Sequence, residues 1–170
     1  DYRFVTTCTN GGAQDITAAY SVAVNPATQC YCIPTYSTGC TAGDVINTFT
    51  LTGDNGTAFN DLNTGCSAGA YDDRTALPPV DLEIGQSYSG IVSSDYGSNN
   101  PVIFLIDFND DGIFDNTTEV VGDLTNASTS GSSYTITIPA TAQPGLHRMR
   151  ARLVYATTNI DPCSNSYTYG

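Results

Sequence analysis

The sequence is divided into short stretches of alternating apolar and polar residues, separated by glycine, proline and asparagine. Such alternation places successive side chains on opposite faces of a strand, whereas a surface helix repeats every ~3.6 residues. Helical periodicity is nearly absent, so the stretches predict strands joined by turns. The predicted strands span residues 16–24, 45–51, 86–93, 101–108, 133–138 and 146–155. We therefore expect an all-β fold, an antiparallel two-sheet β-sandwich of the jelly-roll or immunoglobulin-like kind.

Two of these strands carry further information. Residues 101–108 (PVIFLIDF) are apolar on both faces, which predicts a central strand. Residues 146–155 (LHRMRARLVY) place His147, Met149, Ala151, Leu153 and Tyr155 on one face. The other face carries the arginine row, which we define as Arg148, Arg150 and Arg152. Three interpretations stay open for this row: a solvated sheet face, a strip that docks carboxylates of a neighbouring chain, or a site for acidic sugars.

Six cysteines, an even number, fit three disulfides. They are Cys8, Cys30, Cys32, Cys40, Cys66 and Cys163. Zinc binding is the alternative, but a single histidine and one CxC pair make a poor zinc ligand set. We expect disulfides that staple the sandwich, and with them an oxidising, extracellular location. The sequence does not choose among the possible pairings.

The charge is strongly one-sided, with 17 acidic residues against 5 basic ones and a net charge of -12. A nucleic-acid surface needs a basic patch, so we expect no nucleic-acid partner. No apolar run is long enough for a membrane span, and we expect none. The chain shows no signal peptide, so we expect it to be a mature or interior part of a longer secreted protein. An acidic surface also suits divalent cations.

The most specific local motif is the segment 107–119. Its oxygen-bearing side chains match the front of a calcium loop, with a glycine at the sixth position for the sharp turn. The candidate ligands are Asp107, Asn109, Asp111, Asp115 and Glu119. The last of them falls one position later than in an EF-hand, and the preceding segment is a strand, so a true EF-hand is excluded. The alternative is a turn in which Asx side chains bond their own backbone. A bound calcium ion would be structural.

No pattern of catalytic residues is present, and we expect a protein that is not an enzyme. His147, the only histidine, lies on the apolar face of its strand and should be packed or half-buried. Three N-x-[ST] sequons in turn-like stretches could accept glycans. They begin at Asn55, Asn116 and Asn126.

Several segments, taken together and in order, resemble the GEVED domain, a module of secreted bacterial proteins. They include CIPTYSTGCTAGDVINTFTL at 32–51, IDFNDDGIFD at 106–115, ITIPATAQPGLHRMRARLVY at 136–155 and DPCSNSYTYG at 161–170. The resemblance covers residues 32–170 and implies an extracellular β-sandwich without enzymatic activity of its own. It implies no particular ligand. We therefore divide the chain into an N-terminal extension, 1–31, and a GEVED-like sandwich, 32–170.

The resemblance also suggests a role for residues 1–7 (DYRFVTT), which look like the end of the family's acidic signature followed by its closing strand. A sandwich without its last strand exposes unpaired edge groups, and a neighbour's strand can satisfy them. We expect Asp1 to pair with the arginine row of another copy, and Tyr2 and Phe4 to belong to the same contact between copies. Two alternatives remain: tandem modules, with 8–31 as a linker pinned by Cys8–Cys30, and completion within one chain.

These features favour a structural subunit or repeat of an extracellular bacterial filament or surface assembly, joined head-to-tail by strand complementation. The expected partners are copies of the same chain. The alternative is a carbohydrate-binding or adhesive accessory module of a larger secreted protein. Exposed tyrosines would have to serve as its sugar platform, since the chain has 11 Tyr and no Trp.

Overall fold

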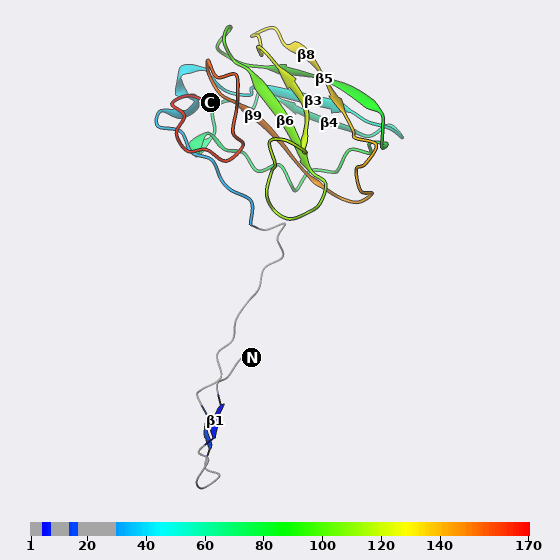
Figure 1. Ribbon diagram of the computed structural model, residues 1–170. Coiled ribbons are helices and arrows are strands. Elements are labelled where there is room, and N and C mark those ends of the chain that lie inside the picture. The colour runs from blue at the N-terminus through cyan, green and yellow to red at the C-terminus, as the bar shows by residue number, and fades with distance from the viewer. Residues whose placement is uncertain (1–4, 8–13, 17–29) are drawn as a thin grey trace.

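The computed structural model describes residues 5–7, 14–16 and 30–170 (Figure 1). The elements in this part of the chain are β1 (Val5–Thr7), β2 (Gln14–Ile16), η2 (Gly39–Ala42), β3 (Thr48–Thr52), β4 (Ala58–Leu62), η3 (Ala68–Ala70), β5 (Ser87–Ser93), β6 (Val102–Asp107), β7 (Val120–Leu124), β8 (Ser132–Thr137) and β9 (Arg148–Leu153). Helix is confined to the short 3-10 turns η2 and η3. The prediction of an all-β fold is confirmed.

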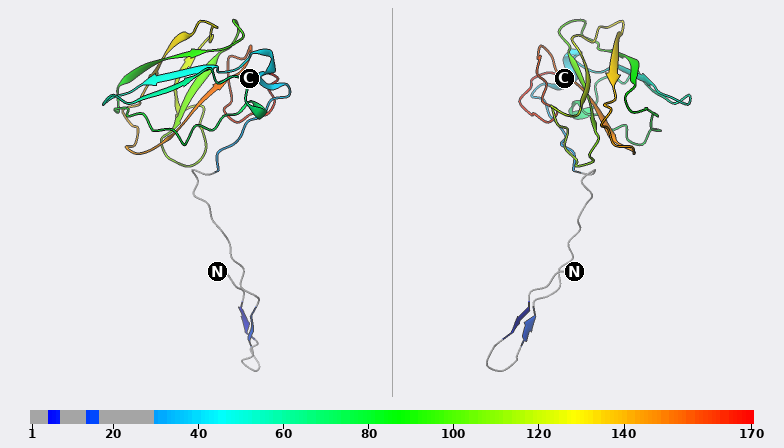
Figure 2. Two further views of the ribbon diagram at one scale, coloured as in Figure 1. Left: turned by 180° about the vertical axis from the view of Figure 1, so that it is seen from behind. Right: turned by 45° about the vertical axis from the view of Figure 1, so that its right-hand side comes forward.

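The strands form two antiparallel sheets that pack face to face, as the two views of Figure 2 show. One sheet has the order β4-β3-β5-β8 and the other β7-β6-β9, while β1 and β2 form a separate antiparallel pair. On one side the sheets meet at β7 and β8, where a Cβ added to Gly122 would lie 2.5 Å from the Thr135 carbonyl oxygen. On the other side, β4 and β9 are edge strands. The predicted two-sheet sandwich is confirmed.

The core between the sheets is built around a stack of aromatic rings. Phe104 of β6 lies 4.1 Å from Tyr134 of β8, and Phe49 of β3 lies 5.6 Å from the same ring, measured between centroids. The other buried core residues are Leu51, Val92, Val102, Ile106, Val121, Ala127, Ile136, Ile138 and Leu153. Apart from Ala127 and Ile138, which lie outside the strands, these positions come from strands of both sheets, as a sandwich requires.

Five of the six predicted strands are present, and no end is shifted by more than three residues. The predicted strand 16–24 overlaps β2 only at Ile16, and residues 17–29 lie outside the described residues. Strands β4 and β7 were not predicted.

A further layer covers the outer face of the three-stranded sheet. This covering layer consists of residues 30–42 and 155–170, joined by the disulfide Cys32–Cys163 and by backbone bonds such as that from the Thr38 N–H to the Thr168 carbonyl at 2.9 Å. Beneath it lies a second apolar cluster of Ile103, Leu105, Phe114, Val154 and Ile160. Strand β6 is therefore buried on both faces, as its sequence predicts.

Two of the expected disulfides are formed among the described residues, Cys32–Cys163 and Cys40–Cys66. The suggested pair Cys8–Cys30 includes Cys8, which lies outside the described residues. None of the helices in the described part of the chain has the length and hydropathy needed to cross a bilayer.

Candidate functional site

Strand β9 separates two different environments. Its residues Met149, Ala151 and Leu153 pack into or against the core between the sheets. The arginine row points the opposite way, toward the covering layer, because alternate side chains of a strand lie on opposite faces. Two of the three arginines are buried, with Arg150 8% and Arg152 3% exposed.

The buried arginines bind carbonyl groups of the covering layer. Arg150 donates to the carbonyls of Cys32 at 2.6 Å and Pro162 at 2.8 Å. Arg152 donates to the carbonyls of Asp161 at 2.5 Å and Ser164 at 2.8 Å. Burial lowers the pKa of the Arg150 guanidinium. The expectations of a solvated face and of a strip that docks a neighbour's carboxylates are therefore wrong for these two residues, because their donors are used inside the domain.

All three arginines also lie over aromatic rings. Arg148 is half-buried and sits 5.0 Å above the ring of Tyr31. The remaining pairs are Arg150 with Phe114 at 4.5 Å, and Arg152 with Tyr36 and Tyr167 at 5.0 Å each. Guanidinium groups stack favourably on aromatic faces, so the row binds the covering layer to the sheet through stacking as well as hydrogen bonds.

The outer edge of β9 carries backbone N–H and C=O groups that are not paired with any other strand in the described ranges. Its only strand neighbour there is β6. The Leu153 carbonyl points away from β6, since it accepts a bond from the Tyr36 hydroxyl at 3.1 Å. Backbone groups of alternate residues point the same way. Met149 and Ala151 therefore direct their N–H and C=O groups to the open edge.

Residues 169–170 lie beside one end of this edge. The Tyr155 N–H donates to the Tyr169 carbonyl at 3.2 Å. A Cβ added to Gly170 would lie 2.5 Å from the Leu153 carbonyl oxygen. With respect to the described residues, the unpaired part of the edge therefore begins at Ala151 and extends through Met149.

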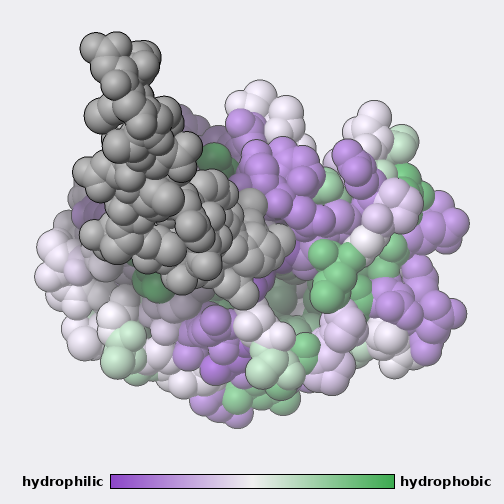
Figure 3. All heavy atoms as spheres, turned by 90° about the horizontal axis from the view of Figure 1, so that it is seen from below, coloured by the Kyte–Doolittle hydropathy of each residue, from purple (hydrophilic) through white to green (hydrophobic). Residues whose placement is uncertain are grey.

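An apolar groove adjoins this edge between the two sheets. Its volume is about 1090 Å³, and its lining includes Phe49, Phe59, Leu82, Phe108 and Met149. These five side chains are only partly buried against the core. On the face seen in Figure 3, hydrophobic side chains reach the surface among hydrophilic ones. A groove beside an open edge can take an extended segment, with backbone bonds to the edge strand and apolar side chains in the groove.

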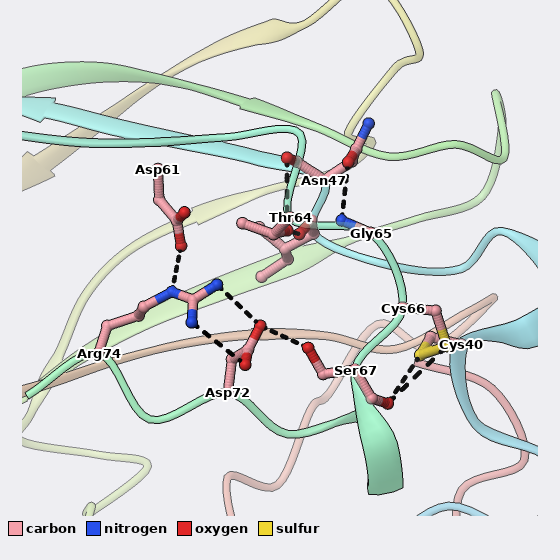
Figure 4. A network of polar contacts seen from close by, with 10 residues as sticks. Cys40, Asn47, Asp61, Thr64, Gly65, Cys66, Ser67, Asp72 and Arg74 are labelled. Atoms are coloured by element: carbon pink, nitrogen blue, oxygen red, sulfur yellow. Dashed lines mark hydrogen bonds and ion pairs between the residues drawn. A yellow bond between two sulfur atoms is a disulfide. The ribbon is translucent and has the colours of Figure 1, made fainter.

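The segment after β4 forms one wall of the groove, and a polar network fixes it (Figure 4). Arg74 donates from Nε to Asp61 at 2.6 Å and from Nη2 to Asp72 at 3.0 Å. The Ser67 hydroxyl donates to Asp72 at 2.6 Å. The disulfide Cys40–Cys66 ties the same segment to η2. The wall is thus fixed to β4 and to the covering layer by polar and covalent links.

The predicted calcium loop connects β6 to β7, and its oxygens bond mainly within the loop. Asn109 Oδ1 accepts from the Asp111 N–H at 2.9 Å, and Asp111 Oδ1 from the Ile113 N–H at 2.8 Å. Asp115 Oδ1 accepts from the N–H groups of Thr117 at 2.7 Å and Thr118 at 2.8 Å. Asx turns of this kind are the structure expected from the alternative interpretation.

Two carboxylates of this loop are buried, Asp107 at 0% and Glu119 at 3% exposed. Burial raises the pKa of Glu119, and the carboxylates of Asp107 and Asp111 raise it further, while the Asp115 N–H acts in the opposite direction. Among the described residues, no three or more His, Cys, Asp and Glu side chains form a metal-binding group by themselves. A cation here would need amide, carbonyl or water oxygens as additional ligands, which calcium uses readily.

His147 is half-buried, as predicted. Its ring meets the edge of Phe108 at 5.6 Å between centroids. Nδ1 lies 3.2 Å from Asp110 Oδ1, and Nε2 lies 2.7 Å from the Gln143 carbonyl. Both ring nitrogens therefore have partners in the loops at this end of the sandwich.

The sequons differ in accessibility. Asn55 and Asn116 are exposed, whereas Asn126 is half-buried. Asn126 Oδ1 accepts from the Asn100 N–H at 2.9 Å, so this side chain joins two loops. The proposed contact residues Asp1, Tyr2 and Phe4 lie outside the described residues.

Tyr31 is a site residue that the sequence analysis missed. Its hydroxyl donates to Asp107 Oδ2 at 2.7 Å, and its ring stacks on Phe114 at 5.0 Å. The hydroxyl contact joins residues 76 positions apart, so no local pattern could indicate it. The one available signal was the neighbouring Cys32, since a disulfide fixes the residues beside it.

The family model of the GEVED domain matches residues 102–170, from the start of β6 to the last residue of the covering layer. The resemblance inferred from the sequence is confirmed over this range, which holds β9, the arginine row and the 107–119 loop. Comparisons with curated proteins and with solved structures gave no match.

Proposed function

Residues 102–170 carry the GEVED domain, and on this premise we propose that the chain is a non-enzymatic structural module of an extracellular bacterial surface assembly. In this proposal, one copy adds a β-strand to the open edge of β9 in the next. The observation that carries the proposal is the free edge at Met149 and Ala151 beside the apolar groove. Unpaired edges of this kind accept strands from other chains.

The proposed occupant is residues 1–7 of a neighbouring copy. Seven extended residues span ~23 Å, about the length of β9. Val5–Thr7 is already extended and pairs antiparallel with β2, and a sheet of two strands is marginal by itself and gains from a third strand. The alternation in DYRFVTT places Tyr2 and Phe4 on one face of such a strand, where they could enter the groove.

One further point supports a location outside the cell, and another concerns the form of the assembly. The disulfides Cys32–Cys163 and Cys40–Cys66 fit an oxidising compartment. A contact between an N-terminal strand and β9 is heterologous, and heterologous contacts that do not close into rings propagate as filaments.

Deletion of residues 1–7 tests the proposal. Light scattering during gel filtration, together with negative-stain microscopy at high concentration, should show assemblies for the intact chain and monomers for the deletion variant. Assembly that survives the deletion would refute donation by this segment. An intact chain that stays monomeric at all concentrations would leave completion within one chain as the explanation.

Two proline variants test the acceptor edge. Ala151→Pro removes an N–H that points away from β6, so it should block strand addition and spare the sheet. Asn60→Pro is the matched control, an exposed position on β4, the edge strand of the other sheet. We expect assembly to be lost only in Ala151→Pro. Equal assembly by both variants would show that β9 is not the acceptor.

A cluster of tyrosines favours carbohydrate binding as the second candidate function. Tyr155 meets Tyr96 at 5.6 Å and Tyr169 at 6.0 Å, both edge to face, and Tyr96 is 42% exposed. Aromatic side chains that are partly exposed can stack on sugar rings. A glycan array with the intact chain and the Tyr96→Ala variant tests this function. Binding that Tyr96→Ala abolishes would support it, and an array without signal would exclude it.

A further inference from the structure

We propose that Asp107 and Glu119 form the centre of a calcium-binding site at the end of the sandwich where β6 passes into β7. Asp107 is the last residue of β6, and Glu119 directly precedes β7. The Ile106 N–H donates to the Glu119 carbonyl at 3.0 Å, which places Glu119 beside the end of β6. This inference is independent of strand addition.

The two carboxylates are buried without a cationic partner. Asp107 is 0% and Glu119 3% exposed, and no arginine or histidine in the described ranges forms an ion pair with either. Buried charges in proteins are normally paired with an opposite charge or coordinate a metal. A divalent cation would supply the missing positive charge.

One oxygen of the Asp107 carboxylate is the main evidence for a bound ion. Oδ2 is oriented by two donors, the Tyr31 hydroxyl at 2.7 Å and the Gly112 N–H at 3.0 Å. Oδ1 is buried and has no hydrogen-bond partner among the residues that the structure describes. Leaving a buried acceptor without a partner is costly, and a bound cation would remove that cost.

Glu119 is the second buried carboxylate of the proposed site. Oε2 accepts from the Asp115 N–H at 2.9 Å, which fixes the side chain at the base of the loop. The turns at Asn109 and Asp111 hold two more oxygen-bearing side chains in the same loop. Oδ1 of Asp115 accepts from two backbone N–H groups, those of Thr117 and Thr118, whereas Oδ1 of Asn109 and Oδ1 of Asp111 each accept from one. We therefore assign Asp115 to the turn and not to the ligand set.

The donor set selects calcium. Carboxylate and amide oxygens are hard ligands, which disfavours zinc and copper. Calcium accepts six to eight oxygens in flexible geometry, whereas magnesium demands near-octahedral ligands at shorter distances. An irregular loop with two fixed carboxylates suits the larger ion.

Thermal unfolding of the chelator-treated chain with added calcium is the first test. Calcium at ~100 times its Kd should raise the melting temperature by about 5–10 °C, and magnesium at the same concentration should raise it less. Terbium offers a second measurement on the unaltered protein, since Tyr31 lies next to the site and can sensitise its luminescence. Calcium should displace the terbium signal.

Variants then locate the site. Asp107→Asn and Glu119→Gln should each weaken calcium binding at least ~100-fold, because loss of a residue that merely positions a ligand already costs ~10–100-fold. Asp115→Asn is the matched control and should bind as the unaltered chain does. If Asp107→Asn fails to fold, calcium binding by Glu119→Gln and the terbium competition decide whether the site lies at these residues. An unchanged melting temperature with calcium, together with no terbium luminescence, would overturn the proposal.

Discussion

Arg150 joins the covering layer to β9 through a charged group that is almost fully buried. Replacement by methionine keeps much of the side-chain volume but leaves the carbonyls of Cys32 and Pro162 without their donor. Hydrogen bonds to charged groups contribute ~1.5–3 kcal/mol each, so Arg150→Met should lower the free energy of unfolding by ~3 kcal/mol or more. Arg148→Met is the control, since Arg148 mainly stacks on Tyr31, and should cost about 1 kcal/mol or less. Urea unfolding measures both. Equal losses would contradict the assignment.

His147 makes stability depend on pH. Burial lowers its pKa, but the Gln143 carbonyl and the Asp110 carboxylate raise it more, so the net shift is upward. Because the folded state favours the protonated ring, this stabilisation is complete below the ordinary histidine pKa. It is lost as the pH rises through the higher folded-state pKa.

Melting curves between about pH 5 and pH 8.5 should show this loss of stability as the pH rises. For a partly exposed pair, we expect the free energy of unfolding to fall by ~0.5 kcal/mol. His147→Gln should remove it, and Asp110→Asn should reduce it. A slope that persists unchanged in His147→Gln would assign the effect to another group.

Strand β5 approaches its neighbours most closely at Gly90. A Cβ there would overlap the Thr50 carbonyl oxygen and would lie 2.6 Å from the Tyr134 hydroxyl oxygen. That hydroxyl bonds the same carbonyl at 2.7 Å, so neither group can move without cost. Gly90→Ala should therefore destabilise the domain by ~3 kcal/mol through overpacking.

Gly97 is the matched control for Gly90. It lies in an exposed loop, where an added Cβ would make ordinary contact with Thr129 at 3.6 Å. Gly97→Ala should change stability by less than ~0.5 kcal/mol. Thermal melting of both variants checks the pair, and a tolerated Gly90→Ala would mean that β3 and β8 can separate.

The sequence predicted best those strands whose pattern of apolar and polar residues follows from burial. Strand β6 is apolar throughout and proved central, and β8 alternates between buried and exposed residues as its sequence does. Strand β4 reads AFNDL, a weak alternation in an edge strand of which only Phe59 packs against the core. Its strand conformation comes from pairing with β3, which a single segment does not encode.

The candidate site also combines features that the local sequence pattern predicts with features that depend on distant segments. The alternation of β9 placed the arginine row on one face correctly. It could not reveal that residues 30–42 and 155–170 would cover that face, because the cover depends on contacts between distant segments. The loop 107–119 was located by its spacing, whereas the burial of Asp107 and Glu119 depends on packing against other segments, including Tyr31.

At the scale of the whole molecule, the disulfide Cys32–Cys163 links the first and last segments of the described sandwich, 30–42 and 155–170. Its cysteines are 131 residues apart in sequence, against 26 for Cys40–Cys66. In the chain-entropy treatment, closing these loops stabilises the fold by about 5 and about 3.5 kcal/mol respectively. Loss of Cys32–Cys163 also loosens the layer that binds Arg150 and Arg152, so its full effect should exceed the entropy alone.

The paired substitution of Cys32 and Cys163 by serine should therefore destabilise the domain more than the same change at Cys40 and Cys66. Urea unfolding of the two double variants measures the difference. The first should also allow faster amide exchange in residues 30–42 and 155–170 while the core strands remain protected, because the sandwich core does not depend on the cover. Equal destabilisation, with no local increase in exchange, would show that the cover is held by its arginines and aromatic rings alone.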